Sequence, residues 1–194
     1  MSQTDRDIKP PLYLPGELSP AEERRRMVRV DQAGEYGAVR IYEGQMAVLG
    51  ATASGAVVER MKEQEERHLE KFNDLMTRRR VRPTALQPLW HMAGFALGAA
   101  TALMGEKAAM ACTVAVEETI DEHYRAQAEK LGEGKDRSED DRELHDLIEE
   151  CRADELAHKE EAEGLGARET PGYSLLSDTI KRGSRLAIWL SQRI

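Results

Sequence analysis

The motif Glu-x-x-His occurs twice in this chain, at Glu65–His68 and at Glu155–His158, about ninety residues apart. Residues three apart leave the same face of a helix, so each pair can direct a carboxylate and an imidazole at one ion. A glutamate on an apolar helical stripe precedes each copy, Glu35 the first and Glu117 the second. Such a set, with one glutamate on each of two helices and one motif on each of two others, is typical of a two-iron site inside a four-helix bundle.

Hydrophobic periodicity predicts an all-α chain with no strand. The segment 1–18 reads as an irregular N-terminal arm, and Ser19-Pro20-Ala21-Glu22 reads as a helix start with Ser19 as the N-cap. We expect four bundle helices and two additional ones in a single domain over 19–194. The additional helices are an uncharged, apolar one within 83–105 and a basic, amphipathic one over 173–194. Turns are expected over 50–55 and 164–172, and a linker over 132–137.

The bundle helices repeat one arrangement: a helix with a glutamate, then a helix with Glu-x-x-His, over 19–80 and again over 106–163. Antiparallel pairing of these halves would bring all six side chains to one depth. The competing interpretation is a set of surface salt bridges, because a pair of Glu-x-x-His matches is weak evidence in a glutamate-rich chain. The position of all six residues on apolar stripes favours the metal site, since a glutamate is costly to bury unless it is paired or bound to metal.

The donor types indicate which metal is expected. Four carboxylates carry four negative charges, which two divalent ions neutralise. Oxygen-rich coordination with one imidazole per ion suits iron or manganese better than zinc. Two carboxylates can bridge the ions while the other two cap them, which leaves open positions for dioxygen.

His123 and Tyr124 follow Glu117 by about two turns and can approach the same site. One interpretation gives them a role beside the ligands, in hydrogen bonding or in relaying electrons and protons. The other is plain core packing, and the spacing does not separate the two. Cys151, one turn before Glu155, is expected to fill the core rather than to bind metal.

Composition limits the partners and the compartment. The formal net charge of -8 argues against nucleic acid as a general partner. Two cysteines do not make a disulfide framework and fit a reducing compartment. The first twenty residues carry acidic groups and no apolar signal core, so we expect the protein on the cytoplasmic side.

The uncharged stretch 83–105 allows three interpretations: contact with a membrane interface, packing inside the protein, or a membrane span. The basic last helix, which carries Trp189, favours the interface. An apolar surface beside an oxygen-activating metal pair suggests a lipid-like substrate.

Several long stretches resemble the demethoxyubiquinone hydroxylase family of ubiquinone biosynthesis (the Coq7 type). They are RVDQAGEYGA (29–38), RIY (40–42), GQM (44–46), 69–83, PLW (88–90), GFALG (94–98), AMACTVAVEE (109–118) and HY (123–124).

This resemblance implies a ferritin-like monooxygenase that hydroxylates the ring of a polyprenylated methoxy-methyl-benzoquinol with dioxygen. It implies that two iron ions are held by the six residues that periodicity selects: Glu35, Glu65, His68, Glu117, Glu155 and His158. It also implies peripheral attachment to the inner membrane of the cell and a partner protein that presents the lipid. A homo-oligomer is compatible with this interpretation.

The main alternative is an iron-storage protein of the bacterioferritin type, which can share these ligands. A storage shell does not call for an uncharged stretch of this length or a basic, Trp-bearing tail, so the hydroxylase is preferred.

Overall fold

The computed structural model describes residues 17–132 and 138–194, and its regular structure there is helical throughout. The predicted arm over 1–18, except its last two residues, and most of the 132–137 linker lie outside the described residues. Within those ranges, the elements in chain order are α1 (Pro20–Leu49), α2 (Ala53–Arg79), α3 (Gln87–Leu103), α4 (Glu106–Gly132), α5 (Glu139–Gly164), the 3-10 helix η1 (Ala167–Glu169) and α6 (Tyr173–Ser191). The predicted all-α, ferritin-like bundle with two additional helices is confirmed.

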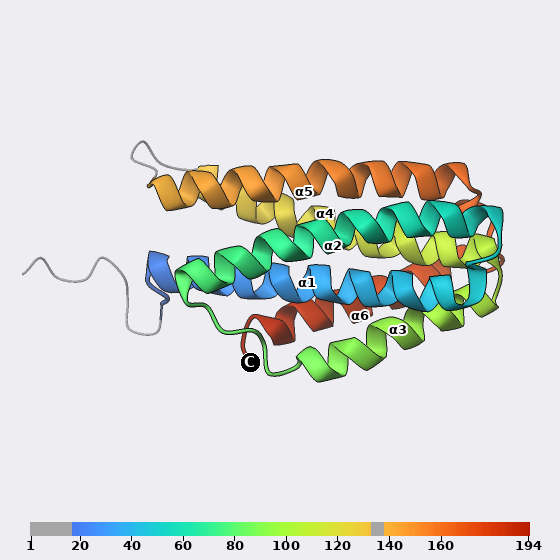
Figure 1. Cartoon of the computed structure of the whole chain (residues 1–194), viewed down its shortest axis with the longest axis horizontal. Coiled ribbons are helices and arrows are strands. Elements are labelled where there is room, and N and C mark those ends of the chain that lie inside the picture. Colours follow the sequence, from blue (N-terminus) through green and yellow to red (C-terminus); the bar gives the residue numbers. More distant parts are fainter. Residues whose placement is uncertain (1–16, 133–137) are drawn as a thin grey trace, which may run out of the picture.

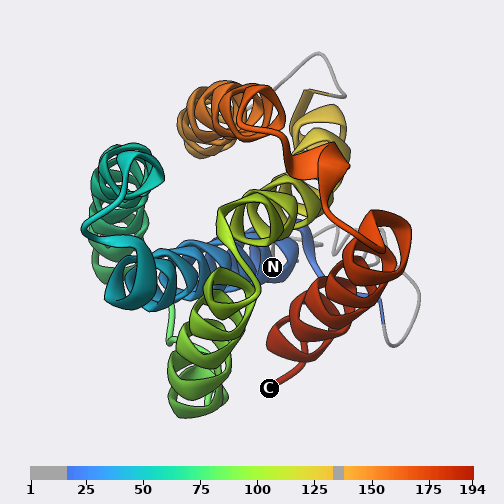
Figure 2. The same cartoon turned by 90° about the vertical axis from the view of Figure 1, so that its right-hand side faces the viewer.

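The four long helices α1, α2, α4 and α5 form the bundle, with their axes close to the long axis of the molecule (Figure 1). Each half contributes one antiparallel hairpin, α1 with α2 and α4 with α5 (Figure 1). The end-on view shows α3 and α6 on the opposite side of α1 and α4 from α2 and α5 (Figure 2). Helices α1 and α4 therefore lie between the other bundle helices and the additional pair.

Local sequence signals set the helix boundaries. Ser19 caps α1 in the predicted capping box, in which the Ser19 amide donates to the Glu22 carboxylate at 3.0 Å. The turn predicted over 50–55 is shorter than expected because the Thr52 side chain caps α2, so the helix already begins at Ala53. Arg80 ends α2 in the left-handed conformation, with φ 52° and ψ 42°.

Helix α3 packs against α1 with the two backbones in direct contact. A Cβ atom on Gly98 would collide with the Ile41 carbonyl oxygen, and one on Gly44 would collide with the Phe95 carbonyl oxygen. Glycine is therefore required at both positions by space rather than by backbone conformation. This contact fixes the uncharged helix along α1.

Helix α6 packs its buried Ile180 against Cys112, Ala115 and Val116 of α4, and polar groups add to this contact. Lys181 forms an ion pair with Glu118 on α4, and Arg185 does so with Glu122 at 2.9 Å. The Trp90 indole nitrogen donates to the Ser191 hydroxyl at 2.9 Å, which joins the start of α3 to the end of α6.

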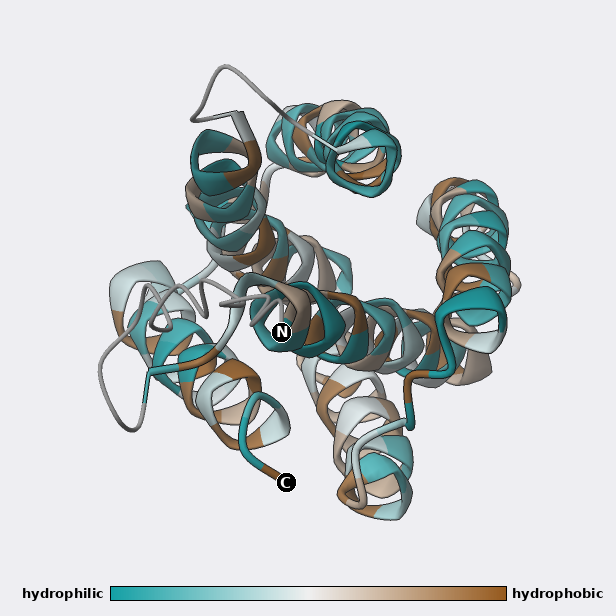
Figure 3. Cartoon of the chain, turned by 90° about the vertical axis from the view of Figure 1, so that its left-hand side faces the viewer, coloured by the Kyte–Doolittle hydropathy of each residue, from teal (hydrophilic) through white to brown (hydrophobic). Residues whose placement is uncertain are grey.

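The surfaces of these helices differ in polarity. Figure 3 shows much hydrophilic colour on the α2–α5 side of the bundle, whereas α3 is mostly pale or brown. Several large apolar side chains on α3 and α6 are exposed, including Met92 at 72% and Trp189 at 50%. Among the described residues, no helix is both long enough and apolar enough to cross a membrane.

Candidate metal centre

The six predicted metal ligands meet in the middle of the bundle. They come from all four bundle helices, and each is at most 2% exposed: Glu35, Glu65, His68, Glu117, Glu155 and His158. Helical phase explains why these carboxylates point inward, because their neighbours Glu66 and Glu118 are less buried and bind lysines at the surface. The structure thus brings the whole predicted set together, and its role in metal binding stays a prediction.

The six side chains form two overlapping groups. Position A consists of Glu35, His68 and the shared pair Glu65 and Glu155. Position B consists of Glu117, His158 and the same shared pair. Within each group, one potential ligand atom per residue lies within 4.8 Å of the others. Two adjacent ions would therefore share two carboxylates, and each would have one carboxylate and one imidazole of its own.

Both imidazoles are held in the orientation that metal binding needs. His158 Nδ1 lies 3.0 Å from Glu65 Oε1, and His68 Nδ1 lies 3.5 Å from Glu35 Oε2, so this nitrogen faces the cluster in each ring. The opposite nitrogen of His158 lies 3.0 Å from Gln64 Oε1. Because that amide oxygen only accepts, His158 Nε2 carries a proton, and Nδ1 is the nitrogen that can bind a metal once it has no proton.

His68 has the same arrangement on the other side of the cluster. Its Nε2 lies 2.9 Å from the Asp154 carboxylate, which also only accepts. Sequence reasoning missed Asp154 and Gln64. A signal was available, because each directly precedes the glutamate of a Glu-x-x-His motif.

Two tyrosine hydroxyls bind the carboxylates that are not shared. The Tyr42 hydroxyl donates to Glu117 Oε1 at 2.5 Å, and the Tyr124 hydroxyl donates to Glu35 Oε1. Each tyrosine lies seven residues after the glutamate of its own helix and binds the glutamate of the other half. The sequence left Tyr124 open between a role beside the ligands and plain core packing, whereas Tyr42 was assigned to the apolar stripe and its contact was missed.

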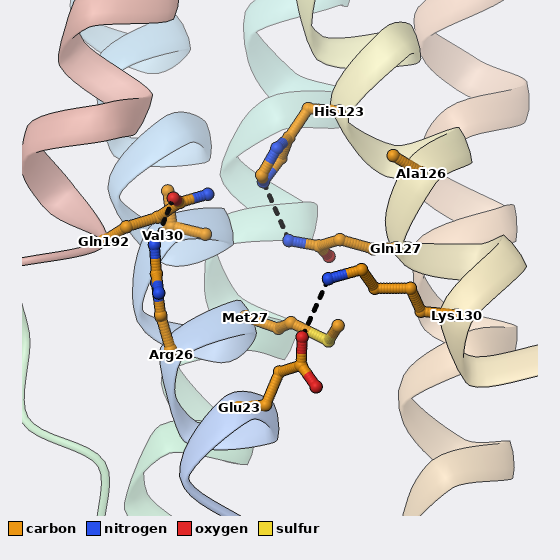
Figure 4. A pocket seen from close by; sticks show the side chains of 9 residues that line it. All are labelled: Glu23, Arg26, Met27, Val30, His123, Ala126, Gln127, Lys130 and Gln192. Atoms are coloured by element: carbon orange, nitrogen blue, oxygen red, sulfur yellow. Dashed lines mark hydrogen bonds and ion pairs between the residues drawn. The ribbon is translucent and has the colours of Figure 1, made fainter. Parts of the chain in front are cut away.

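His123 contacts a carboxylate outside the six-residue cluster. Its Nε2 lies 3.2 Å from Asp31 Oδ1 and 2.8 Å from Gln127 Nε2. His123 and Gln127 border a small pocket of about 180 Å³ between α1, α4 and the end of α6, in which Lys130 pairs with Glu23 (Figure 4). Of the two residues considered for a role beside the ligands, Tyr124 contacts a predicted ligand, Glu35, whereas His123 contacts Asp31 outside the cluster.

The unpartnered atoms of the cluster fit a pair of cations. Among buried polar atoms without a hydrogen-bond partner are both carboxylate oxygens of Glu65 and Glu155 and the Nδ1 atoms of His68 and His158. Buried polar atoms are normally satisfied, so an orphaned set of this kind requires an explanation. Oxygen and imidazole donors converging on two positions are the donors that iron or manganese takes.

The carboxylates have shifted proton affinities without a metal. Burial raises the pKa of Glu35 to about 8. Burial also raises the pKa of Glu117 and of Glu155 well above the ordinary value, and neighbouring carboxylates add to both shifts. For Glu65, burial is outweighed by the close imidazoles of His158 and His68, which hold its pKa at about 2. Protons therefore compensate part of the negative charge that two ions would neutralise.

The imidazoles hold protons for a related reason. Burial acts to lower the pKa of His68, but contacts with Glu35 and Glu65 outweigh it and raise the pKa to about 11. The pKa of His158 is raised as well, because Glu65 and Glu117 outweigh its burial. Since a metal must displace these protons, metal binding is coupled to pH.

An apolar groove of about 420 Å³ lies between α1, α3, α4 and α6. Gly34, Ala38 and Val116 line it, and they lie next to or near Glu35 and Glu117 in the sequence. The helices that present these two glutamates to the cluster thus border the groove on another face. Sequence reasoning expected an apolar surface beside the metal site but did not place this groove.

Fold and site together define an all-helical bundle with a buried, carboxylate-rich centre able to hold two metal ions. Comparison with known proteins narrows this class. The family model described as "Ubiquinone biosynthesis protein COQ7" matches residues 22–191. The chain belongs to this family, as the resemblance in the sequence predicted.

Similar proteins carry hydroxylase names. The chain is 53% identical over 182 residues to the "3-demethoxyubiquinol 3-hydroxylase" of Rhodospirillum rubrum, covering 93% of this chain and 83% of that protein. It is 53% identical over 169 residues to the mitochondrial "NADPH-dependent 3-demethoxyubiquinone 3-hydroxylase" of Homo sapiens, covering 87% and 77%. It is 41% identical over 180 residues to the mitochondrial "5-demethoxyubiquinone hydroxylase" of Saccharomyces cerevisiae, again covering 87% and 77%.

We predict that the metal-free protein becomes less stable as the pH rises. The folded-state pKa of Glu35 is raised from 4.5 to about 8, so its contribution to stability is complete below pH 4.5 and lost as the pH passes 8. The pKa of His68 is raised from 6.5 to about 11, so the loss of stability continues as the pH rises from 6.5 toward 11. Urea unfolding in the presence of a chelator, measured at several pH values from 5 to 9 (roughly the window these shifts define), tests this.

The control is Glu35→Gln, which cannot titrate and should flatten the decline at the lower end of this window. A metal-free protein that gains stability over the same window would contradict the prediction. So would a Glu35→Gln variant with an unchanged slope.

Proposed function

We propose that this chain hydroxylates the ring of a polyprenylated demethoxyubiquinol at two iron ions held by the six-residue cluster. The hydroxylase activity and its place in ubiquinone biosynthesis follow from the family and from the activities for which its relatives are named. The chain is thus an oxidoreductase of ubiquinone biosynthesis, and the iron-storage alternative is not supported. The observation that carries the site assignment is the meeting of all six donor side chains at one buried place.

Iron is favoured by the charge and chemistry of the donors. Four carboxylates and two divalent ions give a neutral centre, and oxygen with imidazole coordination suits iron. When bound, an iron pair supplies the ability to activate dioxygen, so that one oxygen atom enters the ring and the other leaves as water.

The protein's own residues supply orientation and exclusion of water. The Tyr42 hydroxyl holds one carboxylate oxygen of Glu117, and the Tyr124 hydroxyl holds one of Glu35. The second oxygen of each glutamate is left free for a metal. The near-complete burial of all six side chains keeps bulk water from the centre. Two electrons must come from outside this centre.

The apolar groove is our proposed binding site for the quinol ring and the adjoining part of its prenyl chain. Gly34, Gly37 and Gly183 line it, and a Cβ atom on any of them would meet nothing within 4 Å. None has a left-handed backbone, so neither conformation nor packing requires glycine there. Each costs about 1 kcal/mol of helix propensity relative to alanine. A ligand that occupies this space would explain why glycine is present at these positions despite that cost.

Exposed apolar residues on α3 and α6 support peripheral membrane contact. Leu89 and Met92 at the start of α3 lie at the same end of the molecule as Leu186 and Trp189 of α6, because Trp90 contacts Ser191. We propose that this end rests on the cytoplasmic face of the inner membrane. The same surface suits a partner protein that presents the lipid or a second copy of the chain. Eukaryotic relatives are named as mitochondrial.

Complementation tests the proposed function directly. Expression of this chain in a ubiquinone-deficient strain that accumulates the demethoxy precursor should restore hydroxylation of that precursor. Glu117→Ala removes a ligand of position B and should abolish the conversion. Quinone analysis by mass spectrometry gives the readout, with iron content of the purified proteins measured in parallel. Precursor left untouched by the wild-type chain, despite normal expression and bound iron, would refute the substrate assignment.

Filling the groove should block the substrate without disturbing the metal. We expect Gly37→Leu and Gly183→Leu to lower kcat/KM for a short-chain demethoxyubiquinol about tenfold or more, because the ring can no longer reach its position. Gly164→Leu is the matched control, since Gly164 is exposed on α5 outside the groove and also has open space around it. Unchanged kinetics in both groove variants would place the substrate elsewhere.

Removing apolar side chains from the α3–α6 end should weaken membrane binding. We expect Met92→Ser combined with Trp189→Ser to lower co-sedimentation with anionic phospholipid vesicles several-fold, because buried apolar area contributes to interfacial affinity. Val48→Ser removes an exposed apolar side chain of α1 and serves as the control. Equal binding of the double variant and the wild type would argue against this face.

A further inference from the structure

The two metal positions are related by the internal repeat, and this makes their surroundings directly comparable. Glu35 corresponds to Glu117, and Tyr42 corresponds to Tyr124, in sequence spacing and in contact. The shared carboxylates Glu65 and Glu155 contribute to both positions. Any difference in affinity between the positions must therefore come from residues around the six predicted ligands.

The first difference lies behind the histidines. His68 of position A donates from Nε2 to the carboxylate of Asp154 at 2.9 Å, whereas His158 of position B donates to the amide oxygen of Gln64 at 3.0 Å. Asp154 and Gln64 occupy equivalent places, each directly before a shared glutamate. A carboxylate draws the Nε2 proton more strongly than a neutral amide does, which raises the electron density on the opposite nitrogen.

A second difference lies one turn before the glutamates that are not shared. Asp31 precedes Glu35, and the equivalent residue before Glu117 is Thr113. Both are buried and both accept from a glutamine: Gln127 donates to Asp31 at 2.8 Å, and Gln45 donates to Thr113 at 3.4 Å. The repeat is preserved in shape, with an acidic group on the side of position A and a neutral hydroxyl on the side of position B.

A third difference lies one turn before the shared glutamates. Cys151 precedes Glu155, and its sulfur lies within 4.8 Å of ligand atoms of Glu35 and His68. The equivalent residue before Glu65 is Met61, a buried thioether with no ionisable proton. In all three pairs the acidic or more polar member belongs to position A.

We propose that the two metal positions are inequivalent, and that position A binds a divalent ion more tightly than position B because Asp154 makes His68 the stronger donor. Asp154 and Gln64 are thus positioning residues that act through the imidazoles. This inference rests on the proposed metal centre. It predicts an ordered filling of the site, first at position A and then at position B.

Titration of the metal-free, full-length protein with Mn²⁺ tests the proposal. Wild-type protein should bind two ions in two resolved steps. Asp154→Asn keeps the size of the side chain but removes its charge, and should weaken the tighter step about tenfold or more. Gln64→Glu adds a charge at the equivalent place and should tighten the weaker step, so that the two steps move together.

Single-position variants assign the steps. Glu117→Ala disables position B and should leave one tight ion, whose affinity falls when Asp154→Asn is added. Glu35→Ala disables position A and should leave one weak ion, whose affinity rises when Gln64→Glu is added. The Mössbauer spectrum of the iron-loaded wild type should show two distinct environments, which become more alike in Gln64→Glu.

The outcomes separate this inference from the proposed function. Failure of the wild type to bind any Mn²⁺ or iron would refute the metal centre itself. Two ions of equal affinity, or steps unmoved by both Asp154→Asn and Gln64→Glu, would refute only the inequivalence. Circular dichroism and urea unfolding of the metal-free variants check folding. If Asp154→Asn does not fold, Gln64→Glu in the Glu35→Ala background still decides the question.

Discussion

Mutual repulsion among four carboxylates buried in one apolar interior is the constraint on which the rest of this structure depends. Each of these groups would lie in water in an ordinary helical bundle, because burial of an unpaired charge costs far more than one apolar contact returns. Here protons compensate part of the charge, as the raised pKa of Glu35 to about 8 shows. The bundle is therefore built around a site whose charge two cations would balance, and binding of such ions would couple its stability to pH and to metal.

The arrangement of the helices follows from this centre. Donors must converge from four helices, so α1, α2, α4 and α5 run side by side over most of their length. Helices α3 and α6 contribute no side chain to the cluster, and they are joined to the bundle differently. Glycine contacts fix α3 to α1, whereas α6 packs against α4 through the buried Ile180 and through ion pairs of Lys181 and Arg185. The wall of the groove formed by α3 is thus set by close backbone contact, and the wall formed by α6 is set by apolar packing together with surface ion pairs.

Sequence periodicity predicted the six-residue cluster because each residue lies on an apolar stripe, where burial can be inferred one helix at a time. It could not predict contacts that depend on which helices are neighbours. Tyr42 lies on the same kind of stripe as a core residue, and its bond to Glu117 arises only when the two halves pair. Asp154 and Gln64 point out of the cluster and meet the histidine of the opposite motif. The groove depends on the placement of α3 and α6, which periodicity does not encode.

Helix α1 borders both the six-residue cluster and the apolar groove. Its Glu35 faces the cluster, Gly44 admits the backbone of α3, and Gly37 leaves open space in the groove. A larger residue at Gly44 would push α3 away, and a larger residue at Gly37 would fill the groove. Gly44 thus permits close helix packing, whereas Gly37 leaves space open. Glu35 lies on the opposite face of this helix from Gly37 and Gly44, so helix geometry fixes the distance between the six-residue cluster and the groove. In the function proposed above, this rigid helix sets how far a ring bound in the groove lies from the proposed metal centre.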